Sequence, residues 1–492
     1  MICAIKQINI LKSFVIAVFL LGLVNQPVLL AKKLPDIESD MPQLQSFEEA
    51  NINDSDIKVN NEFPDLNWWE DFKDPVLSRY VLAALDNNHD LKSASLAIEE
   101  SKALVRESLG NELPSITINP AYTRQKNSKN LTTPSIQQFE GAGPKLFSPG
   151  STVNIFTAPL NTSYEADFWL KNRKTTLAKK KHLESVQQTY KTAMVLISTE
   201  VANAYFNLLK VDKLIELQNK EIKLYKDTYD LLKAQFDAGL ISYIEVINAE
   251  ENLKRSMSQM SEYELSRSLF VHQLLVLMGQ STANSNIIDR ASIDSIILPE
   301  KLKTGVPSDL VSRRPDILSA EATLARSKIE VSLARKAFFP SIVLSGSYGY
   351  ASTKLSQIFN WDSVLTSFTS SVAQSIFTGG SRRAALRAKK FKYEQYLHDY
   401  YQTVLNAFQE VEDSIASYKY HYKENSNNLE RLDNMKDSVL LMDSKYDQGL
   451  VSYVDVINPN ISLLQVEKEQ LISKSSCLID MLSVYKALGG GY

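Results

Sequence analysis

Cysteine, glycine and proline are scarce in this chain of 492 residues, and so is any surplus of charge. Two cysteines cannot build a disulfide framework or a thiolate zinc site. Five scattered histidines form no HExxH pattern, so we expect no metal site. Sixteen glycines and sixteen prolines exclude collagen-like and low-complexity classes. A formal net charge of −3 lacks the basic surplus of a nucleic-acid binder, so we expect no nucleic-acid partner.

Long apolar runs are equally rare. Only residues 13–31, at the N-terminus, are long and apolar enough to cross a bilayer as a helix. Two lysines precede this run, and a cationic segment followed by an apolar one is typical of a secretory signal. We interpret residues 1–31 as a signal peptide cleaved after Ala31, with an uncleaved anchor as the alternative. Cys477 lies in another apolar stretch and is interpreted as a small buried hydrophobe.

Helix-breaking residues are nearly absent from two long stretches of the chain. Residues 160–298 contain no proline and only two glycines, Gly239 and Gly279. Residues 381–488 contain one glycine, Gly449, and one proline. Each stretch therefore predicts a long helix, one tight turn and a returning helix. We expect these helices at about 168–236, 240–278, 381–447 and 453–488, with shorter upstream helices at about 86–109 and 308–338.

The two predicted turns are near copies of one another. Residues 239–248 read GLISYIEVIN and residues 449–458 read GLVSYVDVIN. A second repeated block surrounds Pro114 and Pro340, upstream of each turn. A duplication on this scale predicts two tandem structural repeats. We assign the chain as signal peptide 1–31, extended segment 32–66, repeat 1 at 67–279, linker 280–306 and repeat 2 at 307–492.

Period-two patterns follow each upstream helix. Ile342, Leu344 and Tyr348 alternate with serines and a glycine, as in a strand with one apolar face. Each repeat thus predicts a β-hairpin, at about 114–164 and 340–377. Its strands of roughly ten residues have the length that crosses a bilayer when tilted. The alternative, a soluble two-stranded ribbon, would be marginally stable.

The number of predicted strands constrains the assembly. Four strands cannot close a transmembrane barrel, which needs about eight or more. Open edges in lipid would leave unpaired backbone groups, each at a cost of several kcal/mol. The barrel must then be shared between chains, and three chains that together supply about twelve strands are the simplest closure.

Four motifs carry a resemblance: Trp68–Phe72 (WWEDF), Arg313–Ile317 (RRPDI), Ala337–Ile342 (AFFPSI) and the paired GLxSYxxVI turns. Together they resemble the TolC-like outer-membrane efflux proteins, in the branch that serves RND-type multidrug pumps. The resemblance implies a mixed, mainly α fold. In such proteins a trimeric transmembrane β-barrel, with four strands per chain, continues into a long α-helical coiled-coil barrel. Many members carry a lipid-modified cysteine just after the signal, and no cysteine stands there in this chain.

The resemblance also implies a function and a set of partners. A homotrimer in the outer membrane, extending into the periplasm, would be the exit duct of a tripartite efflux pump and would conduct drugs or other small solutes passively. Its partners would be a periplasmic adaptor, an inner-membrane pump of RND type and outer-membrane lipid. We expect no enzymatic activity and no cofactor. The alternatives are a duct for type I protein secretion and a soluble periplasmic coiled-coil scaffold.

The hairpin turns are candidate contacts for the adaptor. A glycine permits the tight reversal, and the leucine beside it would offer apolar contact to a partner hairpin. In the family these turns meet the adaptor. The alternative is that the glycines only end helices. The candidate contacts are Gly239, Leu240, Ser242, Gly449, Leu450 and Ser452.

The second turn is also a candidate aperture. The family narrows its tunnel there, with an aromatic residue before the glycine and acids after it. The matching positions are Tyr446, Asp455 and Asn458, so one acid of the two is present. Three copies of Asp455 would repel one another and could bind a cation; alternatively, Asp455 is a solvated helix residue. We expect Pro459 to delay the returning helix by one turn, with Asn458 as its cap.

Basic clusters open both long helices, where cations oppose the helix dipole. A compensating anion is therefore expected, and lipid phosphate below the barrel would supply it. A merely solvated face is the alternative. The candidate phosphate contacts are Lys171, Arg173, Lys174, Arg382 and Arg383.

Overall fold

The computed structural model describes residues 58–60, 63–130, 150–283, 288–296, 298, 301–303 and 307–491. The predicted signal peptide, most of the segment 32–66 and part of the linker 280–306 lie outside these ranges. Within them, no helix combines the length and the apolar character that a membrane span requires.

The chain divides into two compact units, each described by itself. The sheet unit comprises the described parts of residues 101–183 and 324–396. The helical unit comprises those of residues 37–100, 184–323 and 397–492.

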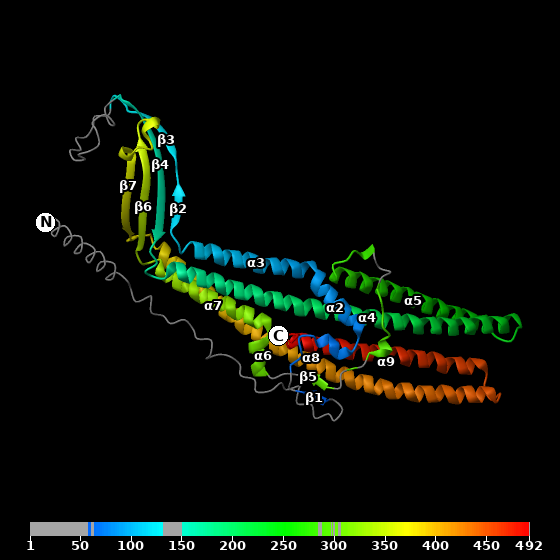
Figure 1. Ribbon diagram of the computed structural model, residues 1–492. Helices are drawn as coiled ribbons and strands as arrows, with labels where there is room; N and C mark the ends of the chain where they lie inside the picture. Colours follow the sequence, from blue (N-terminus) through cyan, green and yellow to red (C-terminus); the bar gives the residue numbers. More distant parts are fainter. Residues whose placement is uncertain are drawn as a thin grey trace. The chain divides into compact units, whose positions relative to one another are not determined.

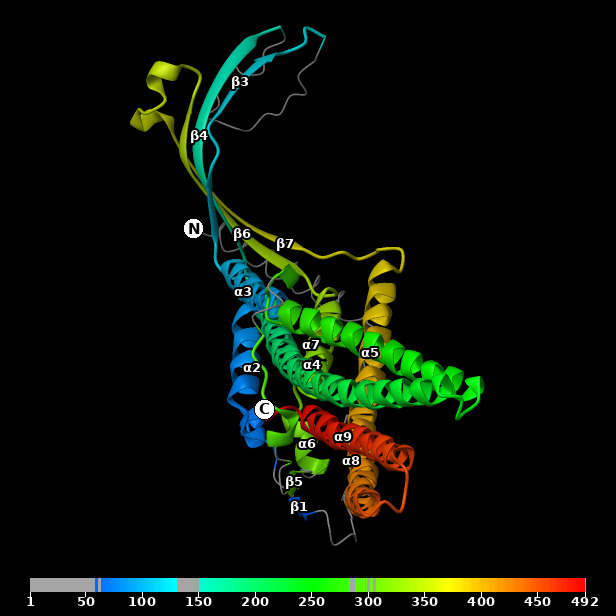
Figure 2. The same ribbon diagram turned by 90° about the vertical axis from the view of Figure 1, so that its right-hand side faces the viewer.

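The sheet unit contains one antiparallel sheet (Figures 1 and 2). Along the sheet the strands follow the order β2–β4–β6–β7, and β3 also pairs with β4. The central pair, β4 with β6, joins the first predicted hairpin to the second through ten residue pairs. No helix of this unit covers either face of the sheet. The strands are β2 (Ser115–Ile118), β3 (Ala121–Lys126), β4 (Thr152–Glu165), β6 (Ser341–Ser352) and β7 (Val364–Ala373).

The outgoing strand of the first hairpin is interrupted between β2 and β3. Pro120 at the break cannot donate a backbone hydrogen bond. The N–H of Asn119 donates to the carbonyl of Pro159 at 3.2 Å, which holds the two strands together at this point. Opposite Pro159 stands Gly349, and a Cβ there would lie 2.6 Å from the Pro159 Cα. Only glycine therefore fits at this position of β6.

The helices recur with equal lengths in the two halves of the chain. The long helices α4 and α8 have 67 residues each, and the returning helices α5 and α9 have 35 each. The upstream helices α3 and α7 both have 22 residues. Their bounds are α3 His89–Gly110, α4 Lys171–Asp237, α5 Tyr243–Leu277, α7 Pro315–Lys336, α8 Ser381–Asp447 and α9 Tyr453–Ala487.

Two shorter helices and a small sheet complete the helical unit. The helix α2 (Pro75–Asn87) precedes α3 and was not predicted, and the helix expected from about residue 86 begins at His89. The two helices part at Asn88, whose extended ψ of 130° ends α2. The helix α6 (Pro307–Arg313) precedes α7 in the same way. The strands β1 (Lys58–Asn60) and β5 (Lys301–Lys303) pair in parallel.

An aromatic cluster forms the centre of the helical unit. Trp68 and Phe72, from the short 3₁₀ helix η3 (Trp68–Phe72), pack against Tyr485 of α9 with ring centroids 5.7 and 6.3 Å apart. Phe206 of α4 lies 5.1 Å from Phe72. Phe72 and Tyr485 are almost completely buried. The WWEDF motif therefore attaches the N-terminal segment of this unit to both repeats of helices.

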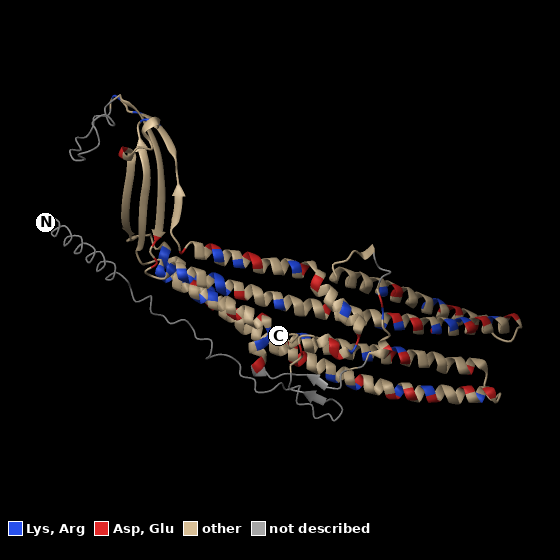
Figure 3. Ribbon diagram, in the orientation of Figure 1, with Lys and Arg blue, Asp and Glu red and all other residues tan. Residues whose placement is uncertain are grey.

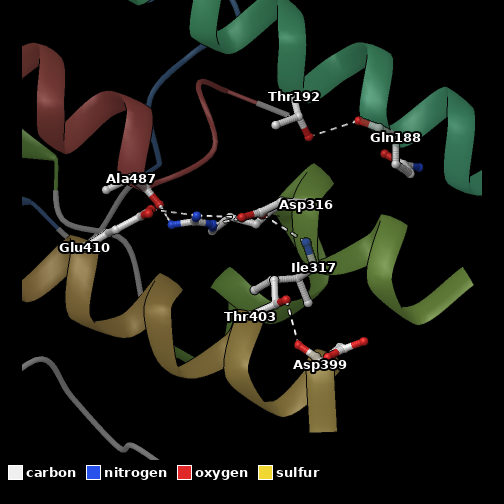
Figure 4. A network of polar contacts seen from close by, with 9 residues as sticks. Gln188, Thr192, Asp316, Ile317, Asp399, Thr403, Glu410 and Ala487 are labelled. Carbon is white, nitrogen blue, oxygen red and sulfur yellow. Dashed lines mark hydrogen bonds and ion pairs between the residues drawn. The ribbon is translucent and has the colours of Figure 1, made fainter. Parts of the chain in front are cut away.

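Arg314 of the RRPDI motif links three helices of this unit through its hydrogen bonds (Figure 4). The Arg314 guanidinium donates to both carboxylate oxygens of Asp316, at 3.0 and 2.7 Å, and to Glu410 at 2.7 Å. It also donates to the carbonyl of Ala487, in the last turn of α9, at 2.8 Å. Burial disfavours its charge, but the two carboxylates outweigh that cost and raise the pKa of Arg314. The motif thus fixes the end of α9 to the start of α7 and to α8.

Candidate functional site

The sheet presents one apolar face and one polar face. Residues paired across antiparallel strands lie on the same face, so the strand register assigns each side chain. The apolar face carries Ile116, Ile118, Tyr122, Phe156, Leu160, Tyr164, Ile342, Leu344, Tyr348, Tyr350, Phe368 and Val372. The polar face carries mainly hydroxyl and amide side chains, together with Ile155, Val343, Leu365 and the charged Glu165; the polar ones are Ser115, Thr117, Thr157, Asn161, Ser163, Ser345, Ser347, Ser367, Thr369 and Ser371.

The apolar face is open in the single chain. Phe368, midway along the outer strand β7, is 77% exposed, and Ile116 on the opposite outer strand is 67% exposed. Figure 3 shows that the strands carry very few charged residues. Both outer strands, β2 with β3 on one side and β7 on the other, have only one strand neighbour each. A single chain therefore leaves an apolar surface and two sheet edges without a covering element in the sheet unit.

Both hairpin turns end their long helix with the same glycine cap. Gly239 and Gly449 adopt left-handed conformations, with φ of 74° and 72°. The N–H of Leu240 donates to the Gln235 carbonyl, and that of Leu450 donates to the Lys445 carbonyl, both at 2.9 Å. This is the Schellman arrangement, in which the residue after the glycine bonds back to the last turn of the helix.

The leucines beside these glycines project into solvent. In a Schellman cap the residue at this position commonly packs on an apolar side chain of the last turn. Here the facing residues are Gln235 and Lys445, and Leu240 and Leu450 stay 74% and 68% exposed. The two exposed leucines therefore contribute little to their own hairpins and remain available to a partner.

An aromatic pair bridges each hairpin behind the glycine. Phe236 and Tyr243 lie with ring centroids 5.2 Å apart, and Tyr446 and Tyr453 lie 5.7 Å apart. Tyr446, proposed for the aperture, is thus a partner of Tyr453 within its own hairpin. The first hairpin also exposes Ile244.

Ser452 and Asp455 form a capping box at the start of α9. The Asp455 carboxylate accepts from the backbone N–H of Ser452 at 2.9 Å and from its hydroxyl at 2.6 Å. These two hydrogen bonds lower the pKa of Asp455, which therefore stays ionised at neutral pH. The structure thus gives Asp455 a capping role in its own chain. At the first turn, Ser242 caps α5 by accepting from the N–H of Ile244.

The expected delay at Pro459 is wrong. The helix α9 begins at Tyr453, with Ser452 rather than Asn458 as its cap, and contains Pro459 in its interior. The capping box sets the start of the helix one turn earlier. Val456 and Ile457 are buried and hold that first turn, although a proline removes one backbone hydrogen bond. Asn458 is an exposed residue within the helix.

The first basic cluster already has an anion at its helix end. The Asp167 carboxylate accepts from the backbone N–H groups of Lys171, Asn172 and Arg173, the last at 3.0 Å. The Lys171 ammonium pairs with Glu165 at 3.0 Å. An aspartate four residues before the basic run was the signal that the sequence reasoning missed. The N-terminus of α4 therefore needs no anion from outside the chain.

The second basic cluster has no such aspartate. Arg382 donates to the Ser375 hydroxyl at 2.9 Å, and Arg383 is exposed. Lys174 of the first cluster donates to Ser332 at 3.0 Å, still within the sheet unit. Figure 3 shows the basic residues gathered at the ends of these helices beside the sheet. Lipid phosphate remains a proposal here.

The described part of the chain holds no group of three histidine, cysteine or carboxylate side chains that could bind a metal ion. Cys477 lies fully buried within α9, as the sequence predicted.

A family model described as "Outer membrane efflux protein" matches residues 81–280 and 306–490. The chain belongs to this family. The match covers both sets of helices and both hairpins of the sheet. This confirms the resemblance to TolC-like efflux proteins and places this efflux family member in the outer membrane.

Individual relatives agree with the family match. The chain is 28% identical over 424 residues to the solvent efflux pump outer membrane protein SrpC of Pseudomonas putida, which covers 86% of this chain and 87% of SrpC. The fold is that of the Campylobacter jejuni CmeC outer membrane channel, with a TM-score of 0.84 and 24% identity, over 93% of this chain and 95% of that one. The outer-membrane channel OprN matches with a TM-score of 0.80 and 22% identity, over 93% and 99%. These relatives are channel proteins rather than enzymes.

Proposed function

We propose that this efflux family member forms a homotrimeric exit duct of a tripartite efflux pump and conducts drugs or other small solutes passively out of the periplasm. The chain would contribute two tandem repeats, at residues 67–279 and 307–492, around a shared transmembrane barrel. An RND-type pump in the inner membrane would supply the energy, and a periplasmic adaptor would connect the two.

The observation that carries this proposal is the uncovered sheet. One face is apolar, the other is lined by serine, threonine and asparagine, and both edges lack a neighbour within the sheet unit. Lipid can cover the apolar face, but it cannot satisfy backbone groups at the edges. Pairing β7 of one chain with β2 and β3 of the next satisfies them. Three chains then give about twelve strands, within the range of transmembrane barrels.

The polar face supports conduction of varied solutes. Most of its side chains are small and carry a hydroxyl or an amide, and the charged Glu165 at the end of β4 is paired with Lys171. A wall of this kind offers weak hydrogen bonds and little fixed charge, so it would hold no solute tightly. This suits a passive exit whose selectivity lies with the pump.

The long helices support a tunnel across the periplasm. At 1.5 Å per residue, α4 and α8 each extend about 100 Å. Their apolar residues pack within the helical unit, as Phe206 and Val411 do. The exposed leucines at the turns, Leu240 and Leu450, would meet the hairpins of the adaptor.

Deletion of the gene tests the function. We expect the deleted strain to become more susceptible to hydrophobic drugs and solvents, with secretion of a protein toxin unchanged. The intact gene should restore resistance. Loss of toxin secretion with unchanged susceptibility would instead establish a type I secretion duct.

The oligomeric state is tested separately. The detergent-solubilised protein should have the protein mass of three chains by light scattering, and it should migrate as a trimer unless heated. A water-soluble monomer that needs no detergent would overturn the proposal and favour the scaffold.

A further inference from the structure

The apolar face of the sheet changes character toward the end that carries the loop between β6 and β7. Aliphatic residues give way to Tyr122 and Phe156, whose rings stack with centroids 4.8 Å apart. Beyond this pair, the next positions of β3 on the same face are Arg124 and Lys126. At this end the face therefore passes from aromatic to cationic side chains.

The loop between β6 and β7 adds exposed aromatic residues at this end of the sheet. Phe359 packs edge-on against Tyr350, an apolar-face residue, with centroids 5.6 Å apart. Trp361, at the start of the 3₁₀ turn η7 (Trp361–Ser363), is 80% exposed, and Phe359 is 78% exposed. Leu355, in the turn η6 (Leu355–Gln357), is exposed as well.

The loop holds these side chains outward although it is internally bonded. The Ser363 hydroxyl donates to the Gln357 carbonyl at 2.8 Å, and Ile358 is buried beneath the loop. The exposed aromatic residues are therefore not a consequence of missing local structure. Arg124 and Lys126 are exposed too, and neither forms an ion pair within the described residues.

We infer that Phe359, Trp361, Arg124 and Lys126 form a headgroup rim, which anchors the outward end of the barrel in a phosphate-bearing, anionic lipid surface. Aromatic rings with a polar edge favour the boundary between acyl chains and headgroups. Arginine and lysine one step beyond that boundary bind phosphate. Because the rim continues the apolar face, this inference rests on the proposed function, in which that face meets lipid.

The position of Trp361 is measured by quenching with brominated lipid. The full chain is reconstituted in phosphatidylcholine vesicles whose acyl chains carry bromine either near the headgroup or near the chain end. The other three tryptophans, Trp68, Trp69 and Trp169, give a constant background that the variant Trp361→Phe measures. Trp361 emission should fall with shallow bromine and much less with deep bromine.

A reporter on the sheet separates this inference from the proposed function. In the Trp361→Phe background, Phe368→Trp places a tryptophan on the apolar face midway along β7, and deep bromine should quench it. If this reporter is quenched and Trp361 is not, the headgroup rim is wrong and the barrel stands; a neighbouring chain then covers the loop. If neither is quenched, both proposals fail.

The cationic part of the rim needs its own reporter. Tyr122→Trp, again with Trp361→Phe, places a tryptophan beside Arg124. Two vesicle mixtures are compared, each with the same fraction of brominated lipid. In the first the brominated lipid is phosphatidylglycerol and the rest is phosphatidylcholine; in the second the two lipids are exchanged. The first mixture should quench the reporter more, because the rim gathers phosphatidylglycerol around it. Arg124→Gln with Lys126→Gln should abolish the difference. Equal quenching by the two lipids while Arg124 and Lys126 are intact would overturn phosphate binding there.

Discussion

A buried polar side chain holds the last turn of each returning helix, and the two halves of the chain use different residues for it. Asn88 donates to the Leu277 carbonyl at the end of α5, at 2.9 Å. Arg314 does the same for Ala487 at the end of α9. The Asn88 side chain also caps α3 by accepting from Asp90 and Leu91. Arginine cannot accept a hydrogen bond, so at the start of α7 the Asp316 carboxylate is the acceptor instead, for the N–H of Ile317.

Arg314→Met should destabilise the helical unit by about 2–3 kcal/mol, because it leaves Asp316, Glu410 and the Ala487 carbonyl without their shared donor. The midpoint of thermal unfolding, followed by helical circular dichroism in detergent, should fall. Arg313→Met is the matched control, since Arg313 is exposed and, among the described residues, stacks over the ring of Phe63. Equal losses in the two variants would refute the role given to Arg314.

Cys477 gives a second test at this scale. Its side chain is fully buried, and burial raises the pKa of the thiol to about 12. Because only the thiolate reacts, Cys477 should resist maleimide in the native protein at pH 8 and react after unfolding. Ser261→Cys, on an exposed position of α5, should react at once. Rapid labelling of native Cys477 would show that α9 is packed differently.

At the scale of the helices, the positions of glycine and proline predicted the helix lengths well and the helix ends less well. The scarcity of glycine and proline marked α4, α5 and α8 to within a few residues. The start of α9 was expected at residue 453, where it lies, but the delay then attributed to Pro459 was wrong, and the break at Asn88 was missed. Each depends on a side chain that bonds to nearby backbone. Ser452 with Asp455 outweighs Pro459, and Asn88 ends one helix while it caps the next. Hydrogen bonds of this kind depend on single side chains, so they leave no periodic pattern in the sequence.

The exposed leucines at the turns should be required for the adaptor contact and dispensable for folding. Leu240→Ser with Leu450→Ser should reduce co-purification of the cross-linked adaptor and raise drug susceptibility. Trimer content and thermal stability should not change, since both side chains are exposed. The matched control is Leu265→Ser, an exposed leucine within α5 away from the turn. Normal adaptor recovery in the double variant would remove the turns from the interface.

Asp455 has two possible roles, and two variants separate them. If three copies of its charge narrow the aperture, Asp455→Ala should raise single-channel conductance in planar bilayers. Ser452→Ala removes the hydroxyl of the same capping box but keeps the carboxylate, so its conductance should stay normal. An equal rise in both variants would assign the effect to fraying of α9, and no rise in either would refute the aperture.

At the scale of the whole molecule, the sequence predicted that the sheet has one apolar side but not how its strands join. Alternation in Ile342–Tyr350 assigns faces to a strand without naming its neighbour. The pairing of β4 with β6, which unites the two hairpins, follows from residues far apart in the chain. The interruption at Pro120 was missed too, although a proline, which cannot donate a backbone hydrogen bond to β4, is visible in the sequence.

Two adjacent residues of β7 test whether the apolar face meets lipid. Phe368 lies on the apolar face and Thr369 on the polar face, and both are exposed in the single chain. A lysine on the lipid side costs about 2–4 kcal/mol near the bilayer midplane, and each trimer would carry three. Phe368→Lys should therefore deplete heat-modifiable trimers from the outer-membrane fraction, whereas Thr369→Lys should assemble normally. A soluble scaffold would tolerate both lysines, since each would lie in water, and equal tolerance would therefore contradict the membrane barrel.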